Sequence, residues 1–181
     1  MASNKELRGR GWEKAVQHKV FKRFLKDEGW KYEFEVPLEL TEFGVEGPNK
    51  KVAKVYVDFL IDKGSHYEVV VCKEGNHPTS ELAAALGQAL VYRSLLWKQA
   101  PYRDADIRLG LCLIDGYPGK YGLWSPAHDA LLRELRKDCG GIELYLIGPV
   151  SPEFRTEEHW DDFEKQKIVW RTRPAGPGGP K

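Results

Sequence analysis

Hydrophobic positions change their spacing near Gly29. Between residues 11 and 28, large apolar side chains recur every three or four positions, which predicts a helix with one apolar face. From Trp30 to Leu40, apolar side chains alternate with mostly charged ones, which is typical of a strand with one face in water. Pro37 lies inside this strand and indicates the edge of a sheet, because proline has no backbone N–H to donate.

The rest of the chain alternates between strand patterns and helix patterns. Strands are predicted over residues 55–61, 67–73, 107–114, 142–147 and 168–171, and helices over residues 79–97, 127–137 and 157–165. The β-branched run Val69–Val71 indicates a strand that is buried on both faces. Glycine and proline in residues 43–51 and 117–125 indicate connecting loops.

The order of these elements is α-β-β-β-α-β, followed by α-β. This order predicts an α/β protein in which helices flank a mixed central sheet. We expect residues 1–173 to form a single domain. Residues 174–181 are rich in glycine and proline, and we expect them to form a disordered tail.

The composition, with 41% hydrophobic and 30% charged residues, is that of a soluble globular protein. The uncharged stretch Leu82–Tyr92 is far shorter than the ~20 residues that a membrane span requires. We expect a cytoplasmic protein without a secretory signal. Three widely spaced cysteines form no CxxC pair, which argues against a zinc site or a disulfide framework (Cys72, Cys112 and Cys139). The histidines form no HxxxH or HExxH pair, and each is predicted to be a surface or turn residue rather than a ligand (His18, His66, His77, His128 and His159).

Charge is distributed unevenly along the chain. Residues 1–31 contain nine basic and four acidic side chains, a net +5, whereas residues 151–165 contain six acidic and two basic ones, a net −4. A basic helix can attract a phosphate backbone. The alternative is an ordinary solvated helix face.

One constellation of polar residues lies in the middle of the chain. Asp58 interrupts an apolar strand, which is costly unless the carboxylate is paired or binds a metal. Lys73 ends the next predicted strand, so a hairpin can bring the two side chains to one end of the sheet. On the following helix, Gln88 and Tyr92 are four residues apart and face the same way. The alternative for Asp58 and Lys73 is a buried ion pair.

The segments Val55–Ile61, Val69–Lys73 and Leu86–Arg93 together resemble the PD-(D/E)XK nuclease superfamily. The order of elements matches the αβββαβ core of that superfamily, which implies a restriction-endonuclease-like fold. The Gly-Gln-x3-Tyr-Arg run and the opening helix are similar to its small XisH-like branch. The resemblance covers roughly residues 11–114.

The resemblance implies a role for each matching residue. Asp58 would bind the metal, and Lys73 would orient or activate the attacking water. Glu13, on the first helix, would hold a metal-bound water. Gln88 and Tyr92 would position the lysine or the nucleic-acid backbone.

The chain departs from the superfamily pattern at Val71. The acid of the (D/E)-x-Lys element should fall two residues before Lys73, and valine offers no oxygen to a hard cation such as Mg²⁺. Glu81, on the long helix, is the best candidate for a relocated acid. Glu13 is the other.

The expected function is metal-dependent hydrolysis of phosphodiester bonds in DNA with Mg²⁺ or Mn²⁺, by an atypical endonuclease. Lys14, Lys22 and Arg93 are expected to contact the substrate. The alternative is a catalytically degenerate module that keeps the nuclease fold for DNA binding or protein assembly. A homodimer and a partner protein that completes the site are further expectations.

Overall fold

The protein is seen in a computed structural model that describes residues 11–40, 53–73, 78–114, 126–139, 141–154, 159 and 162–171. Within these ranges the elements are α1 (Gly11–Asp27), β1 (Lys31–Leu40), β2 (Ala53–Asp62), β3 (Tyr67–Lys73), α2 (Pro78–Leu96), β4 (Ile107–Ile114), α3 (Pro126–Cys139), β5 (Ile142–Pro149), η1 (Pro152–Phe154), η2 (Phe163–Lys165) and β6 (Gln166–Arg171). The predicted loops at residues 43–51 and 117–125 and the predicted tail at residues 174–181 lie outside the described residues.

The strands form one mixed sheet in the order β1-β2-β3-β4-β5-β6. β1, β2 and β3 make an antiparallel meander, β3, β4 and β5 are parallel, and β6 is antiparallel to β5. The helices α2 and α3 supply the crossovers that parallel neighbours require. The predicted α/β class is therefore confirmed, and the architecture is consistent with a restriction-endonuclease-like core.

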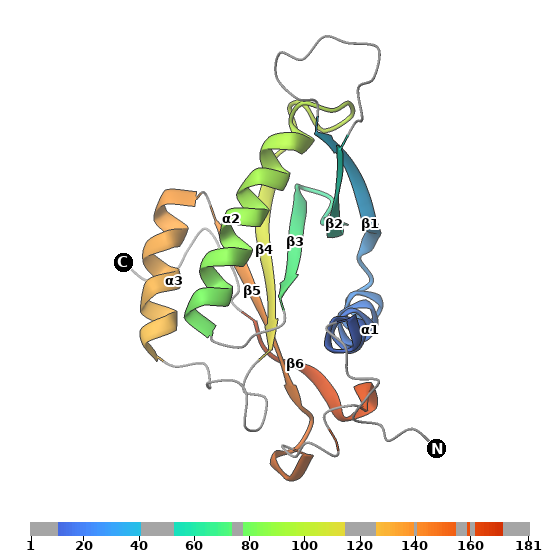
Figure 1. Cartoon of the computed structure of the whole chain (residues 1–181), viewed down its shortest axis with the longest axis vertical. Coiled ribbons are helices and arrows are strands. Elements are labelled where there is room, and N and C mark those ends of the chain that lie inside the picture. The colour runs from blue at the N-terminus through green and yellow to red at the C-terminus, as the bar shows by residue number, and fades with distance from the viewer. Residues whose placement is uncertain are drawn as a thin grey trace.

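Two apolar layers cover the sheet, one on each face. On one face, α2 and α3 pack against side chains such as Val71 and Leu111. On the other face, α1 packs against Phe59, Cys72 and Tyr145. Figure 1 shows α2 and α3 together on one side of the strands and α1 apart from them, near β1. We call these the α2 face and the α1 face.

Several element bounds follow the sequence patterns closely. β3 and β4 have the predicted bounds, and β1 is an edge strand, as Pro37 indicated. All three residues of Val69–Val71 are fully buried, as their β-branched run predicted. Of the predicted helix at residues 157–165, the described part includes the 3-10 turn η2, where the Asp162 side chain accepts the backbone N–H of Glu164.

Among the described residues, no helix is both long enough and apolar enough to cross a membrane.

Candidate functional site

The site is built where β2 and β3 move apart. The ladder between them runs from the Asp62–Tyr67 pair to the Phe59–Val70 pair and ends there. The next residue of β2 is Asp58, whose Oδ2 accepts the backbone N–H of Cys72 at 2.8 Å. A side-chain carboxylate thus accepts the N–H that a backbone carbonyl of β2 would accept in a continuous sheet, and this hydrogen bond fixes the orientation of the carboxylate.

His18 reaches this carboxylate from α1. Its Nε2 lies 3.5 Å from Asp58 Oδ1, and the two side chains are 10% and 5% exposed. The ring also makes edge contacts with Phe34 and Phe59. Burial lowers the pKa of His18, but the adjacent Asp58 carboxylate and Cys72 side chain outweigh it and raise the pKa to about 9. The prediction that His18 is a surface or turn residue is therefore wrong.

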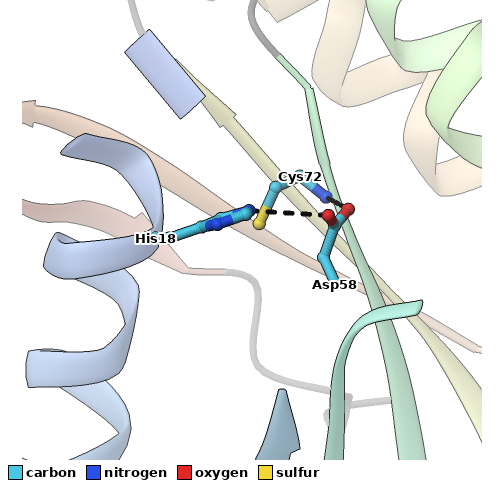
Figure 2. A group of neighbouring side chains, drawn as sticks. All are labelled: His18, Asp58 and Cys72. Carbon is cyan, nitrogen blue, oxygen red and sulfur yellow. Dashed lines mark hydrogen bonds and ion pairs between the residues drawn. The ribbon is translucent and has the colours of Figure 1, made fainter. Parts of the chain in front are cut away.

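Cys72 completes the cluster from β3. Its thiol is buried, and burial raises its pKa well above the ordinary value, so the isolated thiol keeps its proton. One donor atom from each of His18, Asp58 and Cys72 lies within 4.8 Å of the other two. Figure 2 shows the imidazole pointing from α1 toward the carboxylate and the sulfur.

Gln17 fastens α1 to the sheet beside this cluster. Its Nε2 donates to the carbonyl oxygens of Cys112 at 2.8 Å and Lys73 at 3.0 Å. The side chain is 1% exposed, and its Oε1 is buried without a hydrogen-bond partner among the described residues. Gln17 was not predicted as a site residue. The available signal was its place on the apolar stripe, three and four residues before Val20 and Phe21.

Lys73 is placed differently from Asp58. Val71 packs on the α2 face and Cys72 on the α1 face, so strand alternation directs the half-buried Lys73 side chain toward the α2 face. The ion pairs of the described side chains include His18 with Asp58 but not Asp58 with Lys73. The β2–β3 hairpin therefore brings Asp58 to the backbone of β3 rather than to the ammonium group.

The long helix α2 carries its polar residues on the other face of the sheet from His18. Gln88 donates to the Tyr92 hydroxyl, which confirms that the two side chains face the same way. Tyr92 is buried in the α2-face core. Arg93 donates to the carbonyl of Cys139 at 2.9 Å and so joins α2 to α3. The side chains of the other candidates lie outside the described residues (Glu13, Lys14 and Glu81).

A basic and aromatic groove opens beside the end of α1. It has a volume of about 630 Å³ and is lined by Lys22, Arg23, Lys26, Gly29, Trp30, Tyr32 and Phe163. Lys22 Nζ lies 3.3 Å from the centre of the Phe34 ring. Arg23 donates to Glu164 at 2.8 Å and also to the backbone of Phe163 and Gln166. We call this feature the α1 groove.

A second buried polar cluster lies at the turn of the β2–β3 hairpin. Lys63 Nζ lies 2.9 Å from Glu68 and 3.4 Å from Glu143, and the three side chains are 7%, 0% and 7% exposed. The Tyr145 hydroxyl lies 2.8 Å from Glu68 and 2.7 Å from Glu143. Burial, followed by the charge of Glu143, raises the pKa of Glu68 to about 7. No spacing or motif in the sequence predicted this cluster.

No family model matches the chain, and no curated protein matches it. The fold is similar to that of an XisH family protein from Nostoc punctiforme. The two chains are 16% identical, with a TM-score of 0.45 over 78% of this chain and 94% of the other. A protein of unknown function is 13% identical, with a TM-score of 0.41 over 80% of this chain and 63% of the other.

Proposed function

We propose that this protein binds nucleic acid through the α1 groove, on a restriction-endonuclease-like core. The observation that supports this is the meeting of cationic and aromatic side chains in one groove. Lysines and arginines attract phosphates, and exposed aromatic rings stack on bases of any sequence. Lys26 and Tyr32 are both exposed at this surface, so both kinds of contact are accessible to a ligand.

The donor set at Asp58 supports binding without magnesium-dependent cleavage. Mg²⁺ prefers oxygen ligands, usually one or two carboxylates with water. In the part of the chain that the structure describes, Asp58 is joined by an imidazole and a thiol. His18 already balances the charge of the carboxylate. These residues do not fit a magnesium centre by themselves.

The second candidate function is the metal-dependent nuclease. The observation that favours it is the fixed carboxylate of Asp58 at the point where β2 and β3 part, since Asp58 is the residue to which the resemblance gives the metal-binding role. This candidate needs a further oxygen ligand from Glu13 or Glu81. Mg²⁺ or Mn²⁺ would then supply charge neutralisation at the phosphate.

The binding proposal is tested with fluorescently labelled single-stranded and duplex DNA, in EDTA, at several salt concentrations. The double variant Lys22→Glu/Lys26→Glu should bind about 10-fold or more weakly at low salt and show a shallower salt dependence. Its matched control is Arg133→Glu/Lys137→Glu, which makes the same change of charge on exposed positions of α3. Equal losses in both double variants would overturn the proposal.

The Tyr32→Ser variant separates stacking from charge. It leaves the net charge unchanged, so it should weaken single-stranded binding while leaving the salt dependence intact. The nuclease candidate is tested separately, with plasmid DNA in Mg²⁺ or Mn²⁺. Nicking by the wild type that Asp58→Ala abolishes would establish it, and no nicking in either protein would exclude it.

A further inference from the structure

We propose that His18, Asp58 and Cys72 form a binding site for a transition-metal ion of the zinc class. This site is distinct from the α1 groove, so it stands whether or not the protein binds nucleic acid. The three side chains come from α1, β2 and β3, and the fold is what assembles them. A linear motif such as CxxC is absent here because no two of the donors are close in the sequence.

The distances suit an ion at the centre of the three donors. In a tetrahedral zinc site with bonds of about 2.0–2.1 Å, neighbouring nitrogen and oxygen ligands lie about 3.3 Å apart. His18 Nε2 and Asp58 Oδ1 are 3.5 Å apart, which is long for a hydrogen bond between them. The buried Nε2 makes no hydrogen bond of normal geometry with any described residue.

The kind of donor selects the kind of ion. A thiolate and an imidazole are preferred by zinc and its chemical relatives, whereas magnesium prefers oxygen. Three protein ligands leave one tetrahedral position, as in catalytic zinc sites. Val70, which precedes Cys72 on the same face of β3, adds no oxygen that would favour a harder ion.

A cysteine nucleophile activated by histidine fits the arrangement less well. In a nucleophile–histidine–carboxylate triad, one ring nitrogen faces the nucleophile and the other faces the acid. Here Asp58 and Cys72 both lie toward the same side of His18, as Figure 2 shows. Cys72 is also only 4% exposed, which would keep a substrate from the sulfur.

The surroundings hold the donors in place. The Cys72 backbone N–H holds Asp58 Oδ2, so Oδ1 is the oxygen that faces His18. Gln17 holds the neighbouring turn of α1 against the strand ends through the Lys73 and Cys112 carbonyls. Hydrogen bonds of this outer kind orient metal ligands and strengthen binding.

A bound divalent ion would leave the buried cluster without net charge. The charges of the ion, a neutral His18 imidazole, the Asp58 carboxylate and a Cys72 thiolate sum to zero. Because a metal binds the thiolate form of cysteine, binding should release protons and affinity should rise with pH.

The test uses the full chain, freed of metal by a chelator and titrated with Co²⁺ and Zn²⁺. We expect one ion per chain, a near-ultraviolet charge-transfer band from thiolate to Co²⁺, and the visible bands of tetrahedral cobalt. Zn²⁺ should displace Co²⁺, and a large excess of Mg²⁺ should not. Calorimetry in buffers of different ionisation enthalpy should show that ion binding releases protons.

Matched variants locate the ion. Cys72→Ser should abolish the charge-transfer band and weaken Zn²⁺ binding by about 100-fold or more, beyond the usual effect of outer-shell changes. Cys139→Ser, on α3, is its control and should leave both unchanged. His18→Gln and its control His128→Gln form the second pair, and the same contrast in Zn²⁺ binding is expected between them. Circular dichroism identifies any variant that fails to fold, and the wild-type cobalt spectrum decides the question in that case.

Two results would overturn the proposal. One is a wild-type protein that binds no Co²⁺ or Zn²⁺ in a one-to-one complex. The other is a spectrum without thiolate charge transfer, or one that Cys139→Ser changes as much as Cys72→Ser does.

Discussion

Replacing Lys63 by methionine should destabilise the protein in a strongly pH-dependent way. At an effective dielectric of about 20, charges 2.9 Å and 3.4 Å apart attract by about 6 and 5 kcal/mol, and loss of hydration offsets much of this. Without the ammonium group, the buried pair Glu68 and Glu143 can restore neutrality by binding one further proton. From an ordinary carboxyl pKa of 4.5, this costs about 3 kcal/mol at pH 7 and less than about 1 kcal/mol at pH 5.

The partner variant Glu68→Gln should reduce the pH dependence of stability, whereas Lys63→Met should increase it. Folded Glu68 keeps its proton up to about pH 7, while the unfolded chain releases it near pH 4.5. The free energy of unfolding of the wild type should therefore fall as the pH rises through this window and level off above it. Glu68→Gln leaves one cation facing one carboxylate, so this part of the decline should disappear.

The assay is chemical denaturation followed by tryptophan fluorescence between pH 5 and pH 8. Because His66 lies beside Glu68 and Glu143, all variants carry His66→Gln, which removes its titration from the comparison. Burial raises the pKa of the Tyr145 phenol, so it stays protonated over this range. Equal destabilisation by Lys63→Met at pH 5 and pH 8, or an unchanged slope in Glu68→Gln, would refute the reasoning.

Three further predictions concern packing. Gly110→Ala should destabilise the protein by about 1–3 kcal/mol, because an added Cβ would lie 2.3 Å from Glu68 Oε1. Gly87 is exposed and has no neighbour near an added Cβ, so Gly87→Ala should stabilise the protein by up to about 1 kcal/mol. Thermal unfolding compares the two variants. Phe21→Ala should cost about 3–5 kcal/mol in denaturant titration, since the ring is fully buried between other aromatic rings, and a cost below about 1 kcal/mol would contradict this packing. Arg23→Met should speed proteolysis near β6, because it removes the hydrogen bonds from α1 to residues 163–166. An unchanged cleavage rate would show that these hydrogen bonds do not hold β6 in place.

Much of the fold could be predicted from the sequence because many of its elements carry a local signal. The alternating pattern of residues 30–40 and the β-branched run of Val69–Val71 are local signals, and they correspond to β1 and β3 in the structure. Pro37 also predicted the edge strand from a local property, since proline lacks the backbone N–H that an inner strand donates to its neighbour. Helix α3 extends only slightly beyond its predicted range.

The site was less predictable because it depends on contacts between distant parts of the chain. Asp58 was singled out correctly as a costly acid in an apolar strand, and it is buried. Its partners His18 and Cys72 had no spacing that would reveal them, because α1 meets β3 only in three dimensions. Lys63 and Glu68 were missed similarly, since each resembles an ordinary polar residue near a turn.

The strand order also bears on how the chain can fold during synthesis. Every strand pairs with the one made just before it, so the sheet can grow by one strand at a time as the chain leaves the ribosome. The exception among the described elements is α1, which precedes the strands but is held by Arg23 to residues 163–166. Its apolar face can pack against β2, β3 and β5 as these strands assemble, whereas the hydrogen bonds of Arg23 can form only after residues 163–166 have emerged.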